Sequence, residues 1–66
     1  MGLNLKIARI KKGMKQGELC KIVGISRSTL SLLENDKIAN PSKDLMIKLS
    51  KALDVPVMEL FFSDEQ

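Results

Sequence analysis

The chain has 66 residues, and its 11 Lys or Arg against 8 Asp or Glu give a net charge of +3. This length predicts one small domain, 1–66. The single cysteine excludes an internal disulfide, and the lack of histidine argues against a structural zinc site, so we expect no metal and no cofactor. No apolar run is long enough to span a membrane and no signal peptide is evident, so we expect a cytoplasmic protein with no membrane partner.

Composition and charge distribution narrow the fold and the partner. Aliphatic residues are frequent, the only aromatic residues are Phe61 and Phe62, and no stretch alternates as a strand does. We therefore expect an all-α fold of five helices, helped by self-association because the core is small. Residues 1–33 carry seven bases against one acid, and residues 34–66 carry four against seven. A basic half favours a polyanionic partner, although lysines scattered over solvated helices would give the same count.

The first half of the chain predicts three helices. Leu3, Ile7 and Ile10 recur at helical spacing and indicate a first helix of about ten residues that ends before Gly13. A second helix over residues 16–23 ends at Gly24, which suits a left-handed C-terminal residue. Its residues Leu19 and Val23 lie one turn apart and face inward.

The third helix follows after a very short turn. Ser26 is a good N-cap, and two short helices joined by three or four residues with a glycine are typical of a helix-turn-helix, here about 16–35. With about 100° between successive residues, Leu30, Leu33 and Glu34 share the inward side. The outward side then consists of short polar groups and one leucine: Ser28, Ser31, Leu32 and Asn35, with Arg27 at its edge.

The second half predicts a loop and two helices. Residues 35–42 contain Asn, Asp and Pro and form a loop, and Ser42 caps a fourth helix that runs to about Leu53. The inward residues of that helix are Leu45, Leu49, Ala52 and Leu53. A fifth helix at about 56–62 has Pro56 in its first turn, and the last four residues are expected to fray. Adjacent phenylalanines cannot both point inward, so we expect the dimer surface here, at Val57, Met58, Leu60, Phe61 and Phe62. The alternative is that these residues cover the core of their own protomer.

The segment QGELCKIVGISRSTLSLLENDK, followed by Pro41, resembles the lambda-repressor/Cro-like helix-turn-helix family of bacterial and phage transcriptional regulators, which includes repressors. The resemblance extends to LKIARIKKGMKQ before this segment and LMIKLSKALDVPVMELF after it. It implies that Gln16 holds a DNA phosphate at the start of the second helix, with Gly17 beside it. It also implies that Asn35 and Lys37 hold a second phosphate.

The resemblance places base reading at Arg27 and Ser28, with Ser31 and Leu32 further along the same face, and it implies an ion pair between Arg9 and Glu34 with a structural role. Four positions depart from the family pattern. Asp36 replaces the usual glycine but tolerates left-handed geometry, and Cys20 replaces an alanine and is interpreted as core filling rather than a redox sensor. Gly17 either weakens the start of the second helix without a further role or leaves room for the phosphate backbone of DNA. Leu32 replaces a polar base reader.

Leu32 has three interpretations: an ordinary exposed leucine, part of a protein-binding patch, or a contact to a thymine methyl. Its small polar neighbours favour the thymine contact, since they let DNA approach closely. The sequence therefore predicts a regulator that binds double-stranded DNA as a homodimer, with no small-molecule ligand implied. The alternative is a protein-interaction module such as an antitoxin or adaptor domain. An enzyme is not expected, because no nucleophile lies beside a base.

Overall fold

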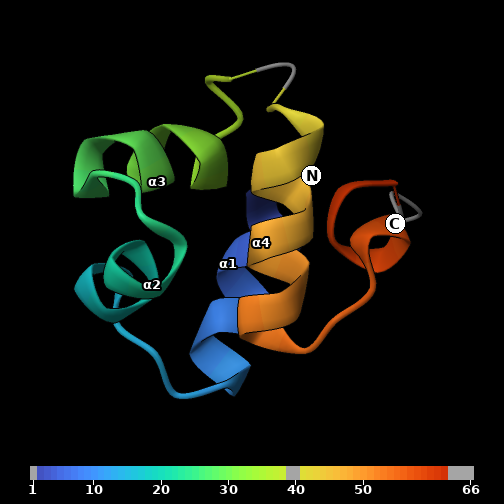
Figure 1. Cartoon of the computed structure of the whole chain (residues 1–66), viewed down its shortest axis with the longest axis horizontal. Coiled ribbons are helices and arrows are strands. Elements are labelled where there is room, and N and C mark those ends of the chain that lie inside the picture. Colours follow the sequence, from blue (N-terminus) through green and yellow to red (C-terminus); the bar gives the residue numbers. More distant parts are fainter. Residues whose placement is uncertain (1, 39–40, 63–66) are drawn as a thin grey trace.

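The computed structural model describes residues 2–38 and 41–62, and within them the chain folds into helices joined by short turns (Figure 1). The residues expected to fray, 63–66, lie outside the described residues, as do two residues of the loop before the fourth helix. In chain order the helices are α1 (Gly2–Lys11), α2 (Gln16–Val23), α3 (Arg27–Glu34), α4 (Lys43–Leu53) and η1 (Met58–Phe62), the last a short turn of π-type helix. The predicted all-α fold with a central helix-turn-helix is confirmed.

The helix ends follow from the residues that occupy them. Ser26 and Ser42 cap α3 and α4, and each hydroxyl accepts the backbone N–H three residues later at 3.1 Å. Gly24 ends α2 with a positive φ of 86°, as predicted. Asp36 and Asp54 also have positive φ, 59° and 58°, so aspartate does adopt the left-handed conformation after α3.

The core is aliphatic and draws on every helix. Leu30 of α3 and Leu49 of α4 are fully buried, as are Leu5 and Leu19, and Phe61 closes the core from η1. The inward residues predicted for α2 and α4 are confirmed: Leu19, Val23, Leu49 and Leu53 are buried, and Leu45 and Ala52 pack against the core.

α1 lies between the helix-turn-helix and η1. It packs against α3 on one side and η1 on another, while α4 packs against α2. Figure 1 accordingly shows α2 and α3 at one end of the molecule's long axis and η1 at the other. A surface on η1 is therefore remote from the outward face of α3.

The apolar repeat that predicts α1 is not the side that packs. Leu3, Ile7 and Ile10 are all exposed, whereas Leu5 is buried together with Arg9. The repeat indicates the helix correctly but marks its solvent-facing side. Among the described residues, no helix combines the length and the apolar character needed to cross a membrane.

Candidate nucleic-acid interface

The outward face of α3 is held in place by the opposite side of the same helix. Leu30 and Leu33 anchor α3 in the core, with exposed fractions of 0% and 1%. At the N-terminal end, the Ser26 hydroxyl lies 2.9 Å from the Thr29 hydroxyl in addition to accepting the Thr29 N–H. Burial of two leucines and a capped first turn fix the rotation of α3 about its axis. What this helix presents to solvent is therefore determined.

Small polar side chains and one leucine form the presented face. Ser28, Asn35 and Arg27 are exposed, Ser31 is half-buried, and Leu32 is 45% exposed. The Asn35 amide donates to the Ser31 carbonyl oxygen at 2.8 Å, so its side chain lies back along the helix. A helix with such a face fits a DNA major groove, where serine, asparagine and arginine donate or accept at base edges and an apolar group meets the thymine methyl.

A buried ion pair connects α1 to α3. Arg9 Nε lies 2.7 Å from Glu34 Oε2, and Arg9 Nη2 donates to Glu34 Oε1 at 3.3 Å. Arg9 also donates to the Met14 carbonyl oxygen at 2.8 Å. Within residues 2–38 and 41–62, no buried side-chain nitrogen or oxygen lacks a hydrogen-bond partner. Both charges are therefore compensated, as buried charges require.

The same carboxylate also holds Gln16, a contact that the sequence does not predict. Gln16 Nε2 donates to Glu34 Oε1 at 3.1 Å, so the start of α2 is tied to the end of α3. A carboxylate can accept several hydrogen bonds, and the amide retains a second N–H. Nothing in the spacing of residues 18 apart indicates this bond, because it depends on how α2 and α3 cross.

The N-terminus of α2 lies beside Arg27. Its N-cap residue, Lys15, offers no side-chain acceptor, and the Lys15 N–H donates to Glu18 Oε1 at 2.8 Å. A Cβ on Gly17 would meet only Arg27 Cδ, at 3.9 Å, so packing within the protein does not require glycine there. A shallow hollow of about 380 Å³ separates the two helix starts, and it is lined by Lys15, Gly17, Glu18, Lys21 and Arg27. Arg27 and Gly17, which the sequence assigns to base reading and phosphate binding, are therefore neighbours.

The far end of α3 turns back on itself. The Asp36 N–H donates to the Leu33 carbonyl oxygen at 3.3 Å, and the Lys37 N–H donates to the Leu32 carbonyl oxygen at 2.8 Å. These two bonds form a Schellman motif around the left-handed Asp36. The motif fixes the direction in which the exposed Lys37 leaves the helix, next to Asn35.

Two of the five residues predicted to form the dimer surface are buried in the protomer. Leu60 and Phe61 are 1% and 7% exposed and belong to the core of the protomer, so their side chains cannot lie at a surface. Val57 is half-buried, whereas Met58 and Phe62 are 69% and 57% exposed. The expectation that two adjacent phenylalanines point in different directions agrees with these values.

Cys20 is a free cysteine in the core. Cys20 is buried on the inner side of α2, and burial raises the pKa of its thiol, so the thiol is protonated at neutral pH. In the described part of the chain, no group of three or more His, Cys, Asp or Glu residues could hold a metal ion.

Comparison with known proteins adds a family to this geometry. A model of the helix-turn-helix family matches residues 5–60. An uncharacterized helix-turn-helix transcriptional regulator of the archaeon Archaeoglobus fulgidus is 36% identical over the whole chain, which covers 93% of that protein. The transcriptional regulator SinR of Bacillus subtilis is 37% identical over 91% of this chain, which spans 54% of its length.

Solved structures of SinR have the same fold. Its N-terminal DNA-binding domain from Bacillus subtilis superposes with a TM-score of 0.88, at 34% identity, and the match covers 98% of this chain and 94% of that one. SinR crystallised in complex with DNA gives a TM-score of 0.85, at 37% identity, covering 91% and 98% of the two chains. The similar proteins thus come from both archaea and bacteria.

Proposed function

This chain belongs to the helix-turn-helix family of transcriptional regulators, which are DNA-binding proteins rather than enzymes, and from that premise we propose that it binds a palindromic operator as a homodimer in the cytoplasm. α3 enters the major groove, where Arg27, Ser28, Ser31 and Leu32 meet base edges. The observation that carries the proposal is the outward face of α3, which is held rigidly by Leu30, Leu33 and the Glu34 ion pair.

Phosphate contacts flank this face at both ends. At the start of α2, Gln16 and Gly17 bring the positive end of a helix towards the DNA backbone, and Gln16 is oriented for this by its bond to Glu34. At the other end of α3, Asn35 lies at the helix end with its amide bonded to the Ser31 carbonyl oxygen, and Lys37 follows the Schellman turn. Phosphates bound at these two places fix the register of α3, and the base contacts between them select the sequence.

Self-association supplies a second α3 helix, which can contact a second half-site on the DNA. One helix of eight residues reads few bases, and a two-fold dimer doubles the number it reads. Met58 and Phe62 are exposed apolar side chains on η1, at the opposite end of the molecule from α3 (Figure 1). A two-fold axis near η1 leaves both α3 helices free to enter two successive major grooves, and half-sites one DNA turn apart are spaced by about 34 Å. The DNA complex of a SinR chain 37% identical to this one supports the DNA-binding part of the proposal.

Operators are first selected from a random pool of duplexes. The affinity of the protein for these duplexes is then measured as a function of salt concentration. Each Lys or Arg that contacts a phosphate contributes about 0.9 to the slope of log affinity against log salt. We expect Lys37→Ala to reduce that slope by about 1.8 if two protomers bind and by about 0.9 if one binds. Lys51→Ala is the matched control, because it removes the same charge from the exposed side of α4, at the end distant from the loop that follows α3.

Two results would contradict the proposal. A wild-type affinity that does not depend on salt would favour a protein-interaction module over DNA binding. Selected sequences without two-fold symmetry, together with a slope change of about 0.9, would exclude the homodimer but leave DNA binding intact.

A further inference from the structure

α1 exposes an apolar stripe on the side opposite the core. Leu3, Ile7 and Ile10 are 63%, 41% and 57% exposed, while Leu5 is 1% exposed. With about 100° between successive residues, these three side chains lie about 140° to 200° from Leu5 around the helix axis. Neither the DNA contacts on α3 nor the dimer contacts on η1 use this stripe. Three aliphatic side chains in one row on a small domain indicate an interaction surface.

The spacing of the stripe is that of a coiled-coil seam. In a heptad, Leu3, Ile7 and Ile10 occupy successive d, a and d positions, which are the positions that pack against a partner helix. The flanking g position carries Lys6, and the two e positions carry Asn4 and Lys11; both lysines are exposed. α1 contains no acidic residue in Gly2–Lys11. The seam is therefore apolar along its centre and positively charged on both sides.

Charge determines what can dock there. A second copy of α1 would bring lysine against lysine in either orientation, which is unfavourable. The other long helix of this chain, α4, exposes Lys43, Lys48 and Lys51 and is no better suited. We propose that α1 docks an acidic amphipathic helix of another protein, with apolar residues along its seam and Glu or Asp at the flanking positions.

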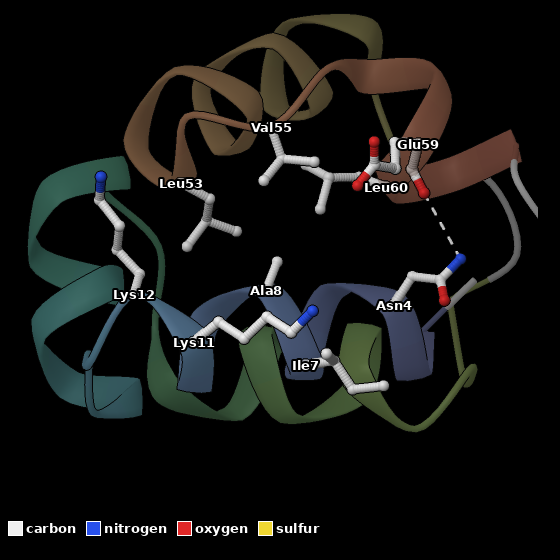
Figure 2. A pocket seen from close by; sticks show the side chains of 9 residues that line it. All are labelled: Asn4, Ile7, Ala8, Lys11, Lys12, Leu53, Val55, Glu59 and Leu60. Carbon is white, nitrogen blue, oxygen red and sulfur yellow. Dashed lines mark hydrogen bonds between the residues drawn. The ribbon is translucent and has the colours of Figure 1, made fainter.

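A groove next to the stripe can accept a larger side chain from this partner. Figure 2 shows Ala8 pointing up from α1 towards Leu53 and Leu60, with Ile7 and Lys11 along the near edge. The groove has a volume of about 510 Å³, and a bond of 3.4 Å from the Asn4 amide to the Glu59 carbonyl oxygen crosses it at one end. Because Ile7 of the stripe and the flanking Lys11 also line the groove, a helix that lies along α1 can place one apolar anchor residue in the groove.

The contact is short, so it is weak and reversible. Ten helical residues extend about 15 Å, which corresponds to the low end of protein–protein interface sizes. The surface operates independently of DNA binding, because α3 packs on another side of α1.

The experiment uses a synthetic helical peptide of three heptads, with leucine at the a and d positions and glutamate at the e and g positions. The glutamates prevent the peptide from pairing with itself. We expect it to bind the full chain with a dissociation constant on the order of 10–100 µM and to shift the NMR signals of α1. Ile10→Ser should weaken binding about tenfold, whereas Ile22→Ser, which alters an isoleucine of matched exposure on α2 (60%), should leave it unchanged.

Charge reversal supplies the decisive comparison. The variant with Lys6→Glu and Lys11→Glu should no longer bind the glutamate peptide and should instead bind a peptide with lysine at the e and g positions. The inference is overturned if wild type binds both peptides equally, if Ile22→Ser is as damaging as Ile10→Ser, or if α1 signals respond only to vesicles of phosphatidylcholine and phosphatidylglycerol. Far-UV circular dichroism of each variant confirms that the fold is intact.

Discussion

Leu32 is the one leucine of α3 that faces solvent, on the same side as Ser28 and Asn35, and we propose that it is a specificity residue. We expect Leu32→Ala to cost about 1 kcal/mol of binding free energy at operators with thymine at one position and nothing at operators that lack it. Competition between duplexes that differ only at that position measures the effect. Ile22→Ala, which removes an exposed aliphatic group from α2, is the control. Equal weakening on every sequence would show that Leu32 is not a base reader.

Burial of Cys20 makes the stability of the protein depend on pH in the alkaline range. Burial raises the pKa of the thiol above its ordinary value of 9.0, so the folded state keeps the proton at a pH where the unfolded chain has lost it. The resulting stabilisation is complete below about pH 9 and is lost as the pH rises through the folded pKa. We expect the free energy of unfolding to fall less between about pH 8 and pH 10 in Cys20→Ala than in wild type. Urea denaturation at the two pH values measures this difference, and equal falls would contradict it.

Single residues differ in how far the sequence determines their roles. Leu30 and Leu33 are predictable because helical spacing alone turns them inward, and Leu32 is predictable by the same arithmetic. The bond from Gln16 to Glu34 is not, because it joins two helices whose crossing no local pattern specifies. The sequence predicts Leu60 and Phe61 at the dimer surface, although both are buried, because an apolar residue of a short helix suits a core and an interface equally well.

Two aspartates at helix ends, Asp36 and Asp54, have the left-handed backbone conformation, which affects stability. Asp54 has φ 58° and ψ 41° after α4, a conformation that costs less in glycine than in a residue with a Cβ. We expect Asp54→Gly to raise the free energy of unfolding by about 0.5–1 kcal/mol, as measured by urea denaturation. Lys51→Gly, on the exposed side of α4, should lower the free energy of unfolding by about 1 kcal/mol. Glycine gives the unfolded chain more backbone freedom, which is lost when the helix forms. A loss of stability in both variants would show that the Asp54 side chain supports the turn.

The sequence determines the helices better than it determines their faces. Caps and glycines mark the ends of α2, α3 and α4 closely, as the bonds to Ser26 and Ser42 confirm. In α1 the strongest repeat lies on the solvent side, because the inward side is made of Leu5, the small Ala8 and the charged Arg9. Arg9 can be recognised as inward only through Glu34, which lies 25 residues away. A helix that buries an ion pair on one side and exposes aliphatic residues on the other therefore gives a misleading pattern.

Across the whole molecule, three surfaces are separated by the packing of a single helix. α1 contacts α3 on one side and η1 on another, so the proposed DNA-reading face and the proposed dimer surface lie apart, and the α1 stripe lies on the exposed side of α1. The molecule is 29 Å long, with α3 and η1 at opposite ends of that axis (Figure 1). The groove beside the α1 stripe is lined by Glu59 and Leu60 of η1, so a helical partner would lie next to the proposed dimer surface but remote from α3.

Loss of the η1 surface should separate dimer formation from DNA reading. We expect Met58→Ser combined with Phe62→Ser to weaken self-association at least tenfold, since each dimer buries both side chains twice. The variant should then bind a palindromic operator more weakly by about the same factor but bind a single half-site as tightly as wild type. Sedimentation equilibrium and duplex binding measure the two effects. Ile22→Ser combined with Ile47→Ser removes two exposed aliphatic side chains elsewhere and should change neither. If wild type bound half-sites and palindromes equally tightly, the homodimer would have no part in operator recognition, and each α3 would have to select its sequence alone.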